Sequence, residues 1–74
     1  MRTKQSIQND INSFLSQKES YKNLCLSNLE LSNNSEDEQE KLYYLGLAIG
    51  FKNMADSIDN IMESLNLEMN TVVE

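Results

Sequence analysis

The chain has 74 residues, no proline, no histidine, one cysteine and a formal net charge of -6. At this length we expect a single helical domain over residues 1–74 with a small core. Without histidine and with one cysteine, the chain cannot build a Cys/His zinc site, a Ser-His-Asp triad or an internal disulfide. The acidic balance argues against direct binding to nucleic acid or to an anionic membrane surface, because both carry negative charge.

The first half of the chain predicts one helix over about residues 4–31. Six residues recur at alternating intervals of four and three: Ile7, Ile11, Phe14, Lys18, Tyr21 and Cys25. This heptad spacing is typical of a helix face that packs against another helix. The polar run over residues 16–20 is the one place where a break is expected if this helix is not continuous, and a break there would give three helices.

Asparagine and serine at positions 32–35 predict a short turn, which makes the two helices antiparallel neighbours. Ser35 and Glu38 have the spacing of a capping box, and Asn66 is a candidate helix end, so we expect the second helix at about residues 36–66. Its heptad positions are Leu47, Phe51, Met54, Ile58, Ile61 and Leu65. The tail over residues 68–74 has no clear pattern and is predicted to be loose.

The segment from Leu42 to Phe51 is apolar on all sides of the second helix. One partner helix covers only a stripe, so such a segment needs more than one neighbour. We therefore predict an all-α fold, an antiparallel two-helix hairpin that forms a homodimer or higher oligomer as a four-helix bundle of coiled-coil type. The predicted oligomer interface consists of Leu42, Leu45, Gly46, Ile49 and Gly50, with the two glycines opening a notch for a neighbouring helix.

Acidic residues gather in two places. Around the turn lie Glu30, Glu36, Asp37, Glu38 and Glu40, and along the outer face of the second helix lie Asp56, Asp59 and Glu63. One interpretation is helix capping and a solvated surface. The functional alternative is a surface that attracts a protein partner with a basic face, since complementary charge raises the association rate.

Four of these acidic residues form two pairs, Asp37 with Glu40 and Asp56 with Asp59, and the members of each pair are three residues apart. The pairs loosely resemble those with which all-α nucleoside triphosphate pyrophosphatases of the MazG type hold magnesium, although this chain has Asp where Glu is the rule in that family. The resemblance implies a magnesium-dependent enzyme. On one helix, however, Asp37 and Asp56 are about 28 Å apart at 1.5 Å rise per residue, so the pairs meet only if two subunits supply them. We predict no enzyme activity, no metal and no cofactor.

Taken together, these patterns predict a small, non-catalytic protein-interaction or regulatory protein that acts as a helical homo-oligomer. The free thiol and the lack of an apolar stretch of membrane-spanning length favour a cytoplasmic location. The alternative is an acidic inhibitor, such as a phage-type anti-defence protein or nucleic-acid mimic, that blocks a basic surface of a partner protein. Carboxylates spaced like phosphates would distinguish this alternative.

Overall fold

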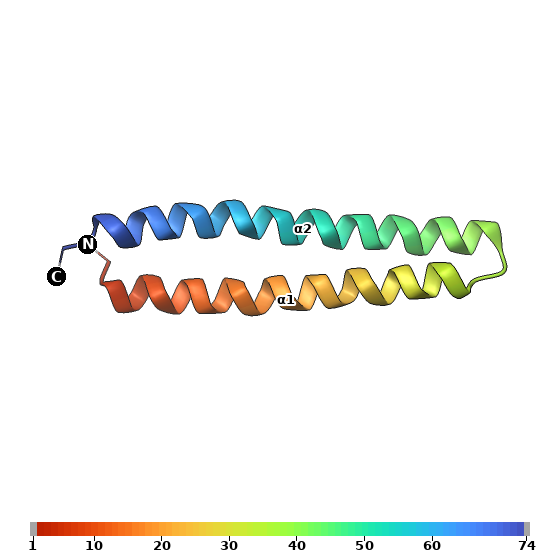
Figure 1. Ribbon diagram of the computed structural model, residues 1–74, viewed down its shortest axis with the longest axis horizontal. Coiled ribbons are helices and arrows are strands. Elements are labelled where there is room, and N and C mark those ends of the chain that lie inside the picture. Colours follow the sequence, from red (N-terminus) through yellow and green to blue (C-terminus); the bar gives the residue numbers. More distant parts are fainter. Residues whose placement is uncertain (1, 74) are drawn as a thin grey trace.

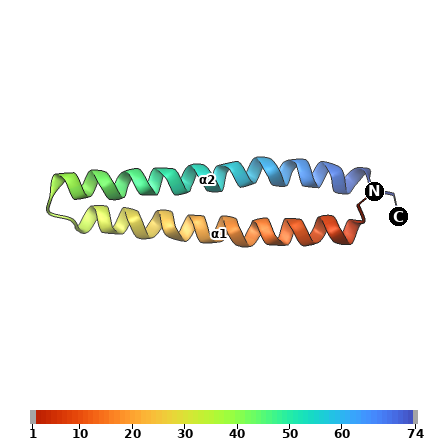
Figure 2. The same cartoon turned by 180° about the vertical axis from the view of Figure 1, so that it is seen from behind.

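The computed structural model describes residues 2–73 and consists of two long helices joined by a short turn (Figure 1). Helix α1 spans Lys4–Asn34 and helix α2 spans Glu38–Thr71. They lie alongside each other over their whole length, as the opposite views in Figure 1 and Figure 2 agree. Both chain ends lie at one end of an elongated hairpin, 58 × 14 × 13 Å in its Cα extents. The predicted all-α hairpin is confirmed, and the three-helix alternative is wrong because α1 is continuous through residues 16–20.

The turn differs in detail from the predicted capping box. The Ser35 hydroxyl donates to the carbonyl oxygen of Leu31 at 2.8 Å and Ser35 ends α1, so it is not available to begin α2. Asp37 caps α2 instead, with its carboxylate accepting the backbone N–H of Gln39 at 2.9 Å. Ser32 ties the two helices together at this point, because its hydroxyl donates to the carbonyl oxygen of Lys41 at 2.9 Å. Helix α2 therefore begins at Glu38, slightly later than predicted.

The other end of α2 lies beyond its predicted limit. The helix passes through Asn66 and continues to Thr71, so most of the predicted loose tail is helical. Its last turn is held by apolar contacts, since Met69 and Val72 pack against the buried cluster of Ile7, Ile11 and Leu65. These contacts continue the interhelical packing past the point where Asn66 suggested an end. Glu74, the last residue of the predicted tail, lies outside the described residues.

The interhelical face of α1 is confirmed, because all six predicted residues are buried or half-buried. The face of α2 is only half right. Phe51, Ile58 and Leu65 face α1 as predicted, but Leu47, Met54 and Ile61 are exposed. The places of the exposed residues are taken by Ala48, Ala55 and Met62. These three residues alternate along α2 with Phe51, Ile58 and Leu65, and they are buried or half-buried.

Side-chain volume explains this shift. The ring of Tyr21 from α1 stacks on the ring of Phe51 from α2, with centroids 6.3 Å apart. Large rings from both helices leave room only for small neighbours, and Ala48 is 1% exposed at such a position. The two alanines on the interhelical face thus let the helices approach closely. The bulkier residues Leu47, Met54 and Ile61 lie outside this face and are exposed.

The two halves of the hairpin differ in what they bury. Toward the chain ends, the interhelical face is apolar and contains Ile7, Ile11 and Leu65. Toward the turn it contains Cys25, Asn28 and Ser32, and the Asn28 amide is satisfied by the carbonyl oxygen of Leu24 at 2.8 Å. Yet nine of the fourteen large apolar side chains that are exposed in the described chain fall within residues 24–49. The turn half therefore has polar and small groups inside and large apolar groups outside.

Candidate interaction surfaces

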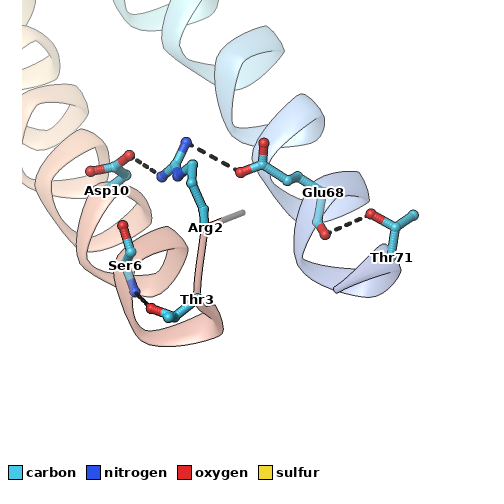
Figure 3. Close-up of polar contacts among 6 residues, drawn as sticks. All are labelled: Arg2, Thr3, Ser6, Asp10, Glu68 and Thr71. Atoms are coloured by element: carbon cyan, nitrogen blue, oxygen red, sulfur yellow. Dashed lines mark hydrogen bonds and ion pairs between the residues drawn. The ribbon is translucent and has the colours of Figure 1, made fainter. Parts of the chain in front are cut away.

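The hairpin has two lateral sides, and an ion pair marks each of them. On one side, the guanidinium of Arg2 lies between Asp10 of α1 and Glu68 of α2 (Figure 3). It pairs with the Asp10 carboxylate, and its Nη1 lies 3.2 Å from Oε1 of Glu68. On the opposite side, Lys18 of α1 pairs with Asp59 of α2. Residues at heptad distances from these pairs share their sides, because side chains seven apart lie on one face of a helix.

The side marked by Arg2 carries a surface that we call the uncharged stripe. It comprises Ser13, Gln17, Ser20, Leu24, Ser27 and Leu31 of α1, and Tyr43, Leu47, Gly50, Met54, Ser57, Ile61 and Ser64 of α2. All of these residues are exposed and none is charged, although charged residues make up 24% of the chain. The stripe ends at Arg2, Asp10 and Glu68 near the chain termini and at Glu40 near the turn.

Across its width, the stripe has the composition of a surface that packs against other helices. Its central row is apolar on α2, with Leu47, Met54 and Ile61. On α1 the facing row carries Leu31 and Leu24 toward the turn and Gln17 at the level of Met54. Its edges carry small residues. The hydroxyls of Ser57 and Ser64 donate back to the carbonyl oxygens of Asn53 and Asn60, at 3.0 and 3.4 Å. If another surface covers these hydroxyls, they remain hydrogen-bonded to carbonyl oxygens of their own helix.

The opposite side, which we call the pocket side, mixes apolar and charged groups. It holds a pocket of about 480 Å³ whose lining includes Lys22, Leu26, Leu29, Lys52 and Asp56. Lys52 pairs with Asp56 one turn further along α2, at 3.3 Å between Nζ and Oδ2. An exposed ion pair of this kind contributes only a few tenths of a kcal/mol, about 0.3–0.5. Toward the turn, Leu42, Leu45 and Ile49 continue this side, at heptad distances from Lys52 and Asp56.

The five residues predicted for the oligomer interface do not form one surface. Leu42, Leu45 and Ile49 lie on the pocket side, Gly50 lies at the edge of the uncharged stripe, and Gly46 lies on the back of α2 away from α1. A Cβ atom added at either glycine meets nothing within 4 Å, so the hairpin itself does not fill the predicted notch. The uncharged stripe was not predicted from the sequence. Serines at positions 6, 13, 20 and 27, each seven residues from the next, are the signal that pointed to it.

Replacing Gly46 by alanine is expected to stabilise the hairpin by about 1 kcal/mol, because glycine is that much less favourable than alanine inside a helix. The added methyl group meets open space, so no steric cost opposes this gain. Thermal unfolding followed by far-UV circular dichroism measures the change. A loss of stability would contradict the expectation and indicate that another molecule packs on the back of α2.

The predicted acidic residues are all exposed. Five surround the turn at one end of the hairpin: Glu30, Glu36, Asp37, Glu38 and Glu40. Asp56, Asp59 and Glu63 do not lie opposite the interhelical face as predicted, because Asp59 reaches Lys18 of α1 and Asp56 lines the pocket. Among residues 2–73, no three His, Cys, Asp or Glu side chains are grouped so as to hold a metal ion. Within the same residues, neither helix combines the length and apolarity that crossing a bilayer requires.

Comparison of the chain with known protein families, with curated proteins and with solved structures gives no match. The class of protein is therefore defined by its architecture, a helical hairpin with exposed apolar residues on both lateral sides.

Proposed function

We propose that this protein is a non-catalytic interaction protein that acts as a homo-oligomer, in which hairpins associate side by side into a four-helix bundle. The observation that carries the proposal is the inverted turn half, where polar and small residues are buried and nine large apolar side chains are exposed within residues 24–49. Four of these side chains lie on the uncharged stripe and five on the pocket side, and monomers rarely expose large contiguous apolar patches. Covering one of these sides with a second hairpin removes apolar area from water, at about 25 cal/mol per Å².

Chain length supports the same proposal. A two-helix hairpin of 74 residues has one layer of interhelical contact, and a core of this size is marginal without reinforcement. Lateral association would add a second layer of contact without lengthening the chain. The acidic cluster at the turn would stay uncovered at the end of such a bundle, where we propose that it attracts a second protein with a basic surface. The regulator and the inhibitor alternatives both use this end.

Sedimentation equilibrium at micromolar concentration tests the proposal. The expected result is a dimer or a higher oligomer, with a melting temperature that rises with protein concentration because association stabilises the folded chain. A monomer that unfolds cooperatively at a concentration-independent temperature would contradict self-association.

A further inference from the structure

We infer that two copies of this chain meet through the uncharged stripe, and that they run antiparallel, with α1 against α1 and α2 against α2 of the second copy. This inference rests on the proposed self-association and assigns its surface and its orientation. The stripe is exposed in the hairpin and lies on one lateral side of both helices.

Charge selects the stripe over the pocket side. Each copy has a net charge of -6, so two copies repel unless their charges stay away from the contact. Burying the pocket side would take Lys22, Lys52 and Asp56 out of water, and desolvation of a charged group costs several kcal/mol, about as much as a good ion pair returns. The stripe has no charged group to desolvate. A second copy is the occupant whose contact surface has the same neutral composition by symmetry.

The stripe is long enough for an extended contact between helices. It covers residues 43–64 of α2, about 32 Å at 1.5 Å rise per residue, which is more than half of the 58 Å Cα extent of the hairpin. Small residues along both edges, such as Ser20 and Gly50, let helices of the second copy approach to about 8–10 Å between axes. The apolar row of Leu47, Met54 and Ile61 then lies at the centre of the contact.

Charge also selects the orientation. In a parallel dimer, the two turn ends would lie side by side, and each carries five carboxylates near a single lysine, Lys41. In an antiparallel dimer, the two acidic turns lie at opposite ends of the bundle, and each lies beside an end of the other copy where the cations Arg2 and Lys4 offset the carboxylates Asp10 and Glu68. A two-fold axis that crosses the stripe at right angles to the helices produces this arrangement. Met54 lies sixteen residues after Glu38 and seventeen before Thr71, so it meets Met54 of the second copy close to this axis.

Two matched substitutions test the surface. Met54 and Ile49 are both near the middle of α2 and are 50% and 52% exposed, but Met54 lies on the stripe and Ile49 on the pocket side. Lysine at either position is compatible with an exposed helix site and changes the net charge equally. We expect Met54→Lys to weaken dimerisation about 100-fold or more in sedimentation equilibrium, because two lysines would be buried together, whereas Ile49→Lys leaves the dimer intact.

Disulfide trapping tests the orientation. In a Cys25→Ser background, oxidation of Met54→Cys is expected to give a covalent dimer, and Ile49→Cys is expected to stay monomeric on a non-reducing gel. A dimer broken by Ile49→Lys and not by Met54→Lys would overturn the stripe but leave self-association standing. A dimer broken by Met54→Lys without trapping at Met54→Cys would overturn the antiparallel arrangement. A monomeric parent chain would overturn both the inference and the proposed function.

Discussion

Replacing Ile7 by alanine is expected to destabilise the hairpin by about 2–5 kcal/mol, the range for truncating a buried isoleucine. Ile7 is 0% exposed and is the one large side chain in the described residues that is completely enclosed. It packs in a cluster with Ile11 and Leu65, against which Phe14 and Met69 also pack. A chain of this size has a total stability of about 4–11 kcal/mol, at 0.05–0.15 kcal/mol per residue. The loss of Ile7 would therefore remove a large share of the total stability.

Urea denaturation followed by far-UV circular dichroism measures this effect. The control is Ile49→Ala, which removes the same atoms from a position that is 52% exposed. We expect that control to change the free energy of unfolding by less than about 1 kcal/mol. Equal losses at the two positions would show that Ile7 does not hold the terminal half of the hairpin together.

The second large effect is expected from Ala48→Leu, which should destabilise the hairpin by about 1–3 kcal/mol through overpacking. Ala48 is 1% exposed and faces α1 where the two helices approach closely. A leucine there has no free space and must push the helices apart. Had Leu47, Met54 and Ile61 formed the interhelical face as predicted from the sequence, position 48 would lie beside that face and a leucine would be tolerated.

Chemical denaturation of Ala48→Leu thus tests the register of α2 directly. A matched control is Asn53→Leu, which places the same side chain at an exposed position on the back of the same helix. The control is expected to be neutral or slightly stabilising, because leucine has the higher helix propensity. Stabilisation by both substitutions would favour the register predicted from the sequence over the one in the structure.

Of these two buried positions, Ile7 could be predicted from the sequence and Ala48 could not. Ile7 was recognised because α1 has a single apolar row near its start, with polar residues such as Gln8 and Asn9 beside it. Only one orientation of that helix buries its apolar groups. Ala48 was missed because α2 has two possible rows, the row of Leu47 and the row of Ala48, on either side of the shared row that contains Phe51. Hydrophobicity alone favours the leucine row.

The candidate interaction surface shows the same division. That the region from Leu42 to Phe51 has more apolar sides than one neighbour can cover was predicted from sequence, because helix geometry sets which residues share a side. Which of these residues lie together was not, since Leu45 and Gly50 fall on different sides once the direction of α1 is known. The uncharged stripe is made jointly by two helices, and its composition is visible only after they are paired.

The sequence by itself determined that the chain forms two long helices, that they turn back close to residues 32–35, and which face of α1 is buried. These properties depend on local hydrogen bonding and on periodicity along one helix. The tertiary structure decided the register of α2, its extension to Thr71 and the division of the exterior into a stripe and a pocket side. Those properties depend on volumes and contacts between residues far apart in the chain, such as Tyr21 with Phe51 and Ile7 with Leu65.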